Sequence, residues 1–418
     1  MTKLFLLAIL LAASPALAAD WPHWRGPQGT GASPELGLPH KWSATENVAW
    51  SVDLASPGAA TPIVSGDTVY VTVAEGDHVH LLALDRANGA ARWKRAIGPA
   101  SGHAHRKHNM ATPSPVTDGA RVYTMTGSGV LKALAVKDGR ELWSRDLPAE
   151  YGPFGLNWGY ASSPLLLDGA LYVPVLHGMK TDAPSYVVSV DAATGRNRWK
   201  VDRPTPAIQE APDAYTTPTF VRAGGKVEVV VTGGDVVTAH DPASGQELWR
   251  STGLNPTNDP WYRVVASPVA SGDLVIAPTR VRPMLALRAG GRGDVTTSHR
   301  AWSFDQGPDI PTPATDGKYL YVVGDKGLVS CLELATGKVL YGPQRIANGT
   351  YSASPVLADG KLYVVNEDGL TTVLKAGPAF EVLSENALSD TTLATPAVAG
   401  GQIFIRTAKK LYCLGRRG

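Results

Sequence analysis

Three things are scarce in this sequence of 418 residues: cysteine, long apolar runs and clusters of one charge. The two cysteines, Cys331 and Cys413, fall in non-neighbouring repeats, and a disulfide needs Cα atoms within about 7 Å, so we expect two buried free thiols. Beyond the N-terminal region no run reaches about 18 apolar residues, which argues against a membrane-spanning helix. The 39 Lys and Arg nearly balance the 37 Asp and Glu without a basic cluster, so we expect no nucleic-acid partner.

The first 18 residues have the organisation of a secretory signal peptide. Lys3 supplies the positive charge, Leu4–Leu11 the apolar run, and Ala16–Ala18 the small-residue cleavage site. The apolar run is too short to span a bilayer, and no cysteine near the cleavage site could carry a lipid. We therefore expect a soluble protein that is periplasmic or secreted.

Glycine and proline, by contrast, are abundant, and they recur in two patterns. The first is Asp-x3-Gly-x3-Trp, found as Asp85–Gly89–Trp93, Asp191–Gly195–Trp199 and Asp241–Gly245–Trp249. The second is a small residue and a proline followed by two apolar runs; it recurs every 41 to 54 residues, at Pro62, Pro113, Pro164, Pro218, Pro268, Pro313, Pro355 and Pro396. A repeat of this length indicates a propeller or a solenoid.

The content of one repeat decides between these two architectures. Thr217–Trp249 contains four short runs rich in β-branched residues, each bounded by Gly, Asp or Pro, which predicts four antiparallel strands. No apolar pattern with helical spacing is sustained, which argues against a helical solenoid. The sequence therefore predicts an all-β, eight-bladed β-propeller made of four-stranded antiparallel blades.

The last repeat is incomplete, because only three predicted strands follow Pro396. Val48–Leu54 places Trp50 in the position of the repeat tryptophan, so we expect this N-terminal strand to complete the C-terminal blade and close the ring. Residues 46–418 would then form a single propeller. Residues 19–45 include the polar, Pro- and Gly-rich Asp20–Ser33, and we interpret them as an ordered strap packed on the propeller.

These repeats resemble the PQQ-like propeller superfamily, which includes the quinoprotein alcohol dehydrogenases and the outer-membrane assembly factor BamB. The similarity runs from Trp21 to Leu414, and the opening WPHWRGP and the later NVAW resemble a secreted bacterial branch of it. The resemblance implies that each repeat tryptophan docks against the neighbouring blade, here Trp50, Trp93, Trp143, Trp199, Trp249 and Trp302. The sixth repeat has Tyr341 instead, and the seventh lacks the ring around Phe380–Leu383.

The resemblance also bears on catalysis. In its quinoprotein branch, PQQ lies between a tryptophan and a disulfide of adjacent cysteines, beside a calcium ion and a catalytic aspartate. This sequence has no adjacent cysteines, no motif that matches the calcium ligands or the base, and no Cys-x-x-Cys-His for haem. Catalytic residues are therefore not assigned, no metal site is predicted, and PQQ is left open as a cofactor.

The connectors between blades differ in length. From the repeat tryptophan to the next small-residue–proline pair they span about 18–20 residues in the first four repeats, starting at Trp93, and about 10–13 in the others. Long loops mounted on one side of a scaffold are where binding sites usually lie. We expect a binding mouth there, lined by His103, His105, Arg106, His108, Trp158, Tyr160, Tyr215, Trp261, Tyr262 and Arg263.

These residue types favour a binding module for a protein segment or for a small anionic or planar ligand. We expect the module to be a monomer. The alternative is an enzyme, either a diverged PQQ-dependent dehydrogenase or another propeller enzyme. His103, His105 and His108 have a spacing that could wrap a metal ion, but the adjacent Arg106 and Lys107 favour an anion instead. Asp305 and Asp309 could serve as a general base, although turn and capping roles suit them better.

Overall fold

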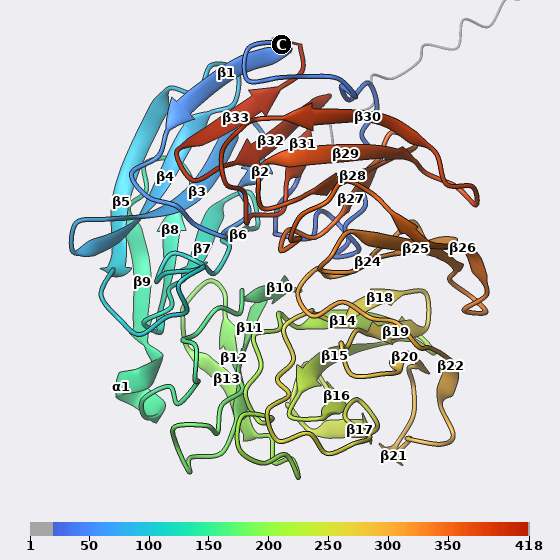
Figure 1. Ribbon diagram of the computed structural model, residues 1–418. Coiled ribbons are helices and arrows are strands. Elements are labelled where there is room, and N and C mark those ends of the chain that lie inside the picture. Colours follow the sequence, from blue (N-terminus) through green and yellow to red (C-terminus); the bar gives the residue numbers. More distant parts are fainter. Residues whose placement is uncertain (1–19, 417–418) are drawn as a thin grey trace, which may run out of the picture.

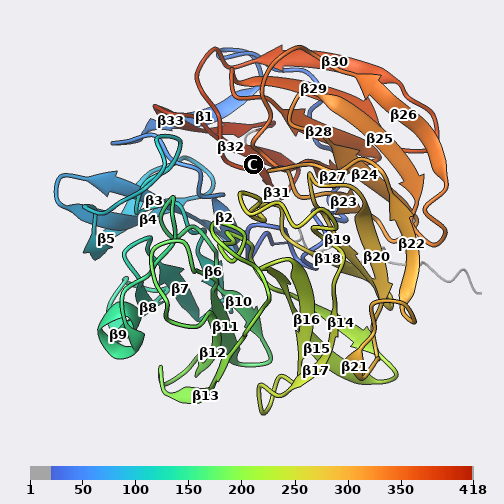
Figure 2. The same ribbon diagram turned by 60° about the horizontal axis from the view of Figure 1, so that its bottom comes forward.

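The computed structural model describes residues 20–416, so the predicted signal peptide lies outside the described residues. Eight sheets of antiparallel strands form a ring around a central axis (Figure 1), and the predicted eight-bladed β-propeller is confirmed. The first strand of each blade lies nearest the axis and the fourth lies at the rim (Figure 2). The described residues contain one short helix, α1 (Leu147–Tyr151), and no helix long and apolar enough to cross a membrane.

The first four blades follow the chain in order. Their strands are β2 (Ile63–Ser65), β3 (Thr68–Glu75), β4 (His78–Asp85) and β5 (Ala91–Pro99) in blade 1; β6 (Val116–Thr117), β7 (Arg121–Met125), β8 (Val130–Ala135) and β9 (Glu141–Asp146) in blade 2; β10 (Leu165–Leu167), β11 (Ala170–Val175), β12 (Tyr186–Asp191) and β13 (Asn197–Asp202) in blade 3; and β14 (Thr219–Ala223), β15 (Lys226–Gly233), β16 (Val236–His240) and β17 (Glu247–Ser251) in blade 4.

The remaining blades complete the circle. Their strands are β18 (Val269–Ser271), β19 (Leu274–Ala277), β20 (Met284–Arg288) and β22 (Arg300–Phe304) in blade 5; β23 (Ala314–Thr315), β24 (Tyr319–Val323), β25 (Leu328–Glu333) and β26 (Val339–Arg345) in blade 6; β27 (Val356–Ala358), β28 (Lys361–Val365), β29 (Leu370–Lys375) and β30 (Val382–Ala387) in blade 7; and β31 (Ala397–Ala399), β32 (Gln402–Arg406), β33 (Lys410–Leu414) and β1 (Val48–Asp53) in blade 8.

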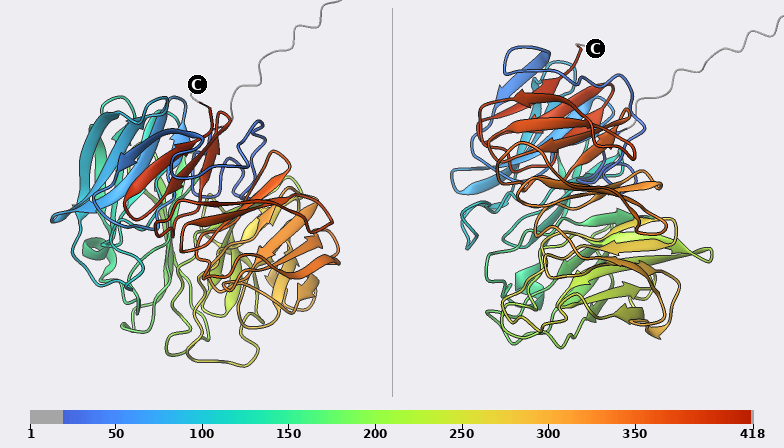
Figure 3. Two further views of the ribbon diagram at one scale, coloured as in Figure 1. Left: turned by 45° about the horizontal axis from the view of Figure 1, so that its top comes forward. Right: turned by 45° about the vertical axis from the view of Figure 1, so that its right-hand side comes forward.

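Blade 8 joins the two ends of the chain. Strand β1 pairs antiparallel with β33, with Trp50 opposite Cys413 and Asp53 opposite Lys410. The C-terminal end of the described chain accordingly lies beside β1 (Figure 3). The predicted closure of the ring by the N-terminal strand is confirmed. Because β1 pairs with β33, the C-terminal strand is not left as an open sheet edge.

Five repeat tryptophans connect neighbouring blades in the same way. Each indole N–H donates to a backbone carbonyl of the next blade at 2.8–3.0 Å: Trp50 to Arg86, Trp93 to Val136, Trp143 to Ala192, Trp199 to Pro242 and Trp302 to Leu334. A large ring that packs on a neighbour and places its polar N–H on a partner fixes both the distance and the angle between two sheets.

Trp249 differs from the other repeat tryptophans. Its indole N–H donates to the carboxylate of Glu228 in its own blade at 2.8 Å, and the side chain is fully buried. The reason is a longer turn in blade 5, which inserts β21 (Gly293–Asp294) as a parallel fifth strand beside β17. This insertion covers Trp249, which still packs in one cluster with Val275 and Leu285 of blade 5. Only the partner of its indole N–H differs from that of the other repeat tryptophans.

The proline pattern also needs one correction. In blade 2 the residue equivalent to the other repeat positions is Ser114, followed by Pro115, and not Thr112 with Pro113. The Ser114 hydroxyl accepts the backbone N–H of Thr61, and the Ser114 N–H donates to the hydroxyl of Ser163. Thr112–Pro113 and Ser114–Pro115 are adjacent in the sequence, and only the hydrogen bonds show which pair occupies the repeat position.

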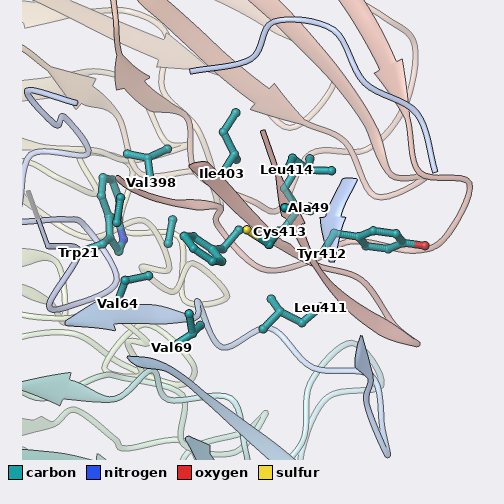
Figure 4. Close-up of a cluster of buried hydrophobic side chains, with 14 of the residues drawn as sticks. Trp21, Ala49, Val64, Val69, Val398, Ile403, Leu411, Tyr412, Cys413 and Leu414 are labelled. Carbon is teal, nitrogen blue, oxygen red and sulfur yellow. The ribbon is translucent and has the colours of Figure 1, made fainter. Parts of the chain in front are cut away.

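The N-terminal strap closes one end of the axial channel. Trp21 forms a two-way backbone bridge with Val64 of blade 1, and Thr117 of blade 2 donates to the Pro22 carbonyl. The strap then reaches Thr315 of blade 6 and Leu357 of blade 7 through further backbone hydrogen bonds. Figure 4 shows the buried Trp21 beside Val64 and Val398, between blades 1 and 8.

The strap also fills a gap in blade 7, which lacks a repeat tryptophan. Trp42 stacks on Tyr363 of β28, with ring centroids 6.3 Å apart and an interplanar angle of 29°. Its backbone N–H donates to Asn386 of β30. In blades 1, 2 and 3 the corresponding pairs join a second-strand tyrosine to the blade's own tryptophan, Tyr70–Trp93, Tyr123–Trp143 and Tyr172–Trp199. The missing ring is therefore supplied from the other end of the sequence.

Candidate functional site

A cavity of about 680 Å³ lies on the propeller axis, at the end where the long loops enter the blades. Its lower wall consists of the residues that precede the first strand of each blade. Its upper wall is formed mainly by the loops after blades 1 to 4, with additions from the later blades at Arg280, Ile310, Ser352 and Leu393. The opposite end of the channel is closed by the strap, and Trp24 of the strap reaches the cavity floor. A cavity of this size is typical of small-molecule sites.

The lower wall is a ring of hydroxyl side chains, one from each blade. The backbone N–H of one member donates to the hydroxyl oxygen of the next at 2.9–3.0 Å, which links all eight members in sequence. We call this the hydroxyl ring; its members, all of which line the cavity, are Thr61, Ser114, Ser163, Thr217, Ser267, Thr312, Ser354 and Thr395. The hydroxyl residue before the first strand therefore recurs at the same position in every blade. Its role there is to form hydrogen bonds between neighbouring blades.

The loop after blade 1 is held against the loop after blade 2 by its histidines. His108 Nε2 lies 2.7 Å from the Trp158 carbonyl oxygen, and His103 Nε2 lies 2.5 Å from that of Asn157. The His105 ring meets Trp158 edge-on, with centroids 5.2 Å apart. Burial lowers the pKa of His108, which favours the neutral ring. The imidazoles of His103 and His108 thus contact separate carbonyls, and residues 20–416 contain no group of three ligands arranged for a metal ion.

Four cationic side chains line the cavity. Lys107 pairs with Glu367 at 2.7 Å, while Arg263 and Arg280 both lie near Asp309, at 3.4 and 3.7 Å. Arg106 is exposed, and within residues 20–416 its guanidinium has no hydrogen-bond or ion-pair partner. The mouth therefore keeps one cation without a protein counter-ion.

The aromatic groups of the mouth are Trp158 and Trp261, which are 38% and 55% exposed. Trp158 is oriented by Glu210, which accepts its indole N–H at 2.6 Å, and by the Tyr215 hydroxyl, which accepts its backbone N–H. The loops after blades 3 and 4 are joined where Glu210 N–H donates to Pro260 O. The two tryptophans thus offer apolar faces beside the cations, an arrangement suited to planar groups.

Asp213 anchors this assembly from below. The side chain is fully buried, and its two oxygens accept the backbone N–H groups of Asn157 and Met179 at 2.6 and 3.1 Å. Burial raises the pKa of Asp213 to about 6. Because the carboxylate ties the loop after blade 2 to residues 177–180 of blade 3, its role is to position the mouth.

The structure brings together seven of the ten residues expected in the mouth. The residues that line the cavity are His105, Arg106, His108, Trp158, Tyr215, Trp261 and Arg263, whereas His103, Tyr160 and Tyr262 do not line it. Tyr160 is buried and donates to Pro174 O, and Tyr262 is buried with its hydroxyl on Thr279. Tyr160 packs in a cluster with residues of blades 2 and 3, and Tyr262 in a cluster with residues of blades 3 and 4.

Sequence reasoning missed Trp24, Arg280 and the hydroxyl ring. A signal for the ring was present in the sequence, because seven of the eight repeat prolines directly follow a Thr or Ser that belongs to the ring. Asp309 pairs with two arginines and donates its backbone N–H to Asp325, and Asp305 is exposed. Neither aspartate lies free in the cavity as a general base would.

The cavity residues do not fit the quinone–calcium arrangement. Cys331 and Cys413 are buried within the sheets of blades 6 and 8, and neither lines the cavity. Glu210 is the one carboxylate in the cavity lining of the described chain, and it is already bonded to the Trp158 indole. Calcium takes six to eight oxygen ligands that include carboxylates, so these residues offer no comparable set.

Comparison with known proteins places the fold in a family. The family model for the outer membrane protein assembly factor BamB matches residues 36–153, 157–296 and 292–378, most of the chain. BamB of Yersinia pestis is 21% identical over 335 residues, which covers 78% of this chain and 76% of that protein. The quinohemoprotein alcohol dehydrogenase ADH-IIG of Pseudomonas putida is 33% identical over 151 residues, but this covers only 34% of this chain and 19% of the dehydrogenase.

Solved structures give the same result for the fold. The quinohemoprotein alcohol dehydrogenase from Comamonas testosteroni superposes with a TM-score of 0.69 at 14% identity, over 95% of this chain and 81% of that one. At this identity the likeness establishes the fold alone. Together with the family match over most of its length, it shows that the chain belongs to the BamB family of PQQ-like β-propellers.

Proposed function

We propose that this protein is an exported binding module whose axial cavity takes an anionic ligand, either a small planar molecule or an extended protein segment. The BamB-like scaffold supports a binding role, since the relative from Yersinia pestis is an assembly factor. The predicted signal peptide supports a role outside the cytoplasm. Function within a propeller comes from the site and not from the fold, so the proposal depends on the mouth.

The observation that carries the proposal is the convergence of cations and aromatic faces on one cavity. Arg106, Trp158 and Arg263 come from the loops after blades 1, 2 and 4, yet they line the same space. Arg106 has no counter-ion within residues 20–416, so an anionic group can pair with it without displacing a protein carboxylate. Guanidinium groups bind carboxylates through paired hydrogen bonds.

Two features favour binding over catalysis. The carboxylates near the mouth are already engaged, Glu210 by the Trp158 indole and Asp309 by Arg263 and Arg280. The imidazoles of His103 and His108 contact backbone carbonyls, which holds the loops together. The Ser352 hydroxyl, which lines the cavity, donates to Glu367, but that carboxylate is also paired with Lys107. Glu367 is therefore held as an ion-pair partner and is not left free to act as a general base.

Isothermal titration with 2-naphthoate and its neutral analogue 2-naphthamide tests the proposal. We expect 2-naphthoate to bind more tightly, and Arg106→Ala combined with Arg263→Ala to weaken it at least about tenfold, which corresponds to about 1.4 kcal/mol. The same variant should leave 2-naphthamide nearly unaffected, and added salt should reproduce the loss because exposed charges are screened.

A matched control removes two positive charges away from the mouth. Arg196 lies in the turn before β13 and Arg288 is the last residue of β20; both are exposed, and neither lines the cavity. Arg196→Ala combined with Arg288→Ala should bind 2-naphthoate as the natural protein does. Equal binding of the acid and the amide, or an equal loss in both double variants, would contradict the proposal.

A further inference from the structure

The hydroxyl ring carries hydrogen-bond donors that have no acceptor in the protein. Seven of its hydroxyl oxygens each accept a backbone N–H from the preceding member. A hydroxyl that accepts still has its own proton to donate, yet across residues 20–416 none of the eight hydroxyls donates to a protein atom. All eight line the cavity, so their O–H groups are available to whatever occupies the axis.

A buried cation lies directly beneath this ring. Arg25 of the strap is 3% exposed and donates to the carbonyls of Pro313 and Pro355, the residues that follow Thr312 and Ser354 of the ring. Its third nitrogen, Nε, is buried without a partner, and no carboxylate of the described chain pairs with the guanidinium. An unpaired buried charge costs several kcal/mol, so the site favours a nearby negative charge.

A second, small cavity beside Arg25 lies directly behind the hydroxyl ring. This cavity of about 20 Å³ is lined by Arg25, and it shares Trp24, Thr217 and Ser267 with the large one. The ring thus separates the two spaces by a single layer of side chains. Burial lowers the pKa of Arg25 to about 9, as expected for a guanidinium without a counter-ion.

The sign of the surrounding charge selects the kind of ligand. A hydroxyl can bind a cation through its oxygen or an anion through its O–H, but seven of the eight oxygens here already accept an N–H, which weakens them as ligands for a cation. The ring also lies between Arg25 below and Arg106 and Arg263 above. A cation on the axis would be repelled from both sides, and an anion would be attracted from both sides.

We propose that the hydroxyl ring and Arg25 form an anion site that takes a carboxylate group on the propeller axis. This inference rests on the proposed function and adds to it the direction of entry: the ligand enters carboxylate first, and its remainder lies against Trp158 and Trp261. The site is built from Thr312 and Ser354 together with Arg25 on one side, and from the other ring hydroxyls around the axis.

Titration calorimetry of the full chain with sodium acetate, compared with acetamide, tests this site. Acetate should bind saturably to one site, and acetamide should not. Thr312→Val, which removes the hydroxyl at nearly constant volume, should weaken acetate binding at least about tenfold. Arg25→Met should have a similar effect. Thr312→Ser and Arg25→Lys keep the hydroxyl and the charge, and each should retain most of the affinity.

Folding of the variants is controlled within the same experiment. Thr312→Val leaves the N–H of Ser267 without its acceptor and so lowers stability, but the acetate–acetamide difference in the natural protein needs no variant. Absence of that difference overturns the proposal, as does unchanged acetate binding in folded Thr312→Val. Chloride that competes with acetate would identify a site for any compact anion, and chloride that does not would identify a carboxylate site.

The outcomes separate this inference from the proposed function. If 2-naphthoate binding depends on Arg106 and Arg263 but not on Thr312 or Arg25, the mouth binds anions and the ring proposal is wrong. If acetate binding depends on Thr312 and Arg25 while 2-naphthoate does not bind, the anion site exists and the proposed larger ligand is wrong.

Discussion

At the scale of single residues, the glycine of the Asp-x3-Gly-x3-Trp motif has a steric cause. The Gly195 N–H donates to Asp191 O, and Asp191 Oδ1 accepts the N–H of Thr194, which forms a tight turn. Gly195 has a φ of 73°, and a Cβ placed on it would lie 2.7 Å from the Trp143 ring of the preceding blade. The absence of a Cβ at Gly195 therefore makes room for Trp143 of the preceding blade. The strand that follows the turn carries the next repeat tryptophan, Trp199.

Replacement of this glycine tests the steric account. Gly195→Ala combines the strain of a left-handed backbone, about 1 kcal/mol, with a clash against Trp143 that should add about 1–3 kcal/mol. Gly225 is the matched control, because its φ of 76° is similar and nothing lies within 4 Å of its Cβ position. We expect denaturant unfolding to show a clearly larger loss for Gly195→Ala than for Gly225→Ala; equal losses would contradict the docking explanation.

Which side chains of a loop face the cavity could not be predicted at this scale. Trp158 and Trp261 line the cavity, whereas Tyr160 and Tyr262, close to them in sequence, are buried. Strands have a period of two that fixes the direction of each side chain, but these loops have no such period. In these loops the direction of each side chain depends on individual hydrogen bonds, such as the one from the Tyr160 hydroxyl to Pro174 O.

At the scale of elements, the strap is a structural part of the blades as well as a plug. Trp42 lies against Tyr363 and beside β30, where the blade has no tryptophan of its own. The Tyr363 hydroxyl also donates to Pro39 O, just as the Tyr172 hydroxyl of blade 3 donates to Pro242 O of the next blade. The sequence revealed the missing ring in blade 7, but it could not show that a residue about 320 positions earlier would replace it.

Removal of the Trp42 ring should therefore destabilise the propeller. Trp42→Ala empties a buried aromatic position, which typically costs about 3–5 kcal/mol. Leu36→Ala in the same strap is the control, because Leu36 is 72% exposed and its truncation should change stability by less than about 0.5 kcal/mol. Denaturant titration of both variants measures the difference, and a near-zero effect of Trp42→Ala would rule out its role in blade 7.

At the scale of the whole molecule, the repeat length, the strand count and the incomplete last repeat were enough to predict an eight-bladed ring closed by Val48–Leu54. These features follow from backbone requirements that recur in every blade, so they leave a periodic trace in the sequence. The insertion of β21 and the path of the strap occur once each, and a feature without repetition leaves no such trace.

Closure of the ring by β1 should determine whether the propeller unfolds as one unit. A chain that begins at Glu46 lacks the strap but keeps β1, and we expect it to melt at a lower temperature in a single transition. A chain that begins after Asp53 also lacks β1, so β33 becomes an open edge and Trp50 no longer reaches the Arg86 carbonyl of blade 1. We expect this shorter chain to lose the single cooperative transition in calorimetry and to associate through the exposed edge in size-exclusion chromatography. If both truncated chains melt alike, the strap and not the closing strand holds the ring together.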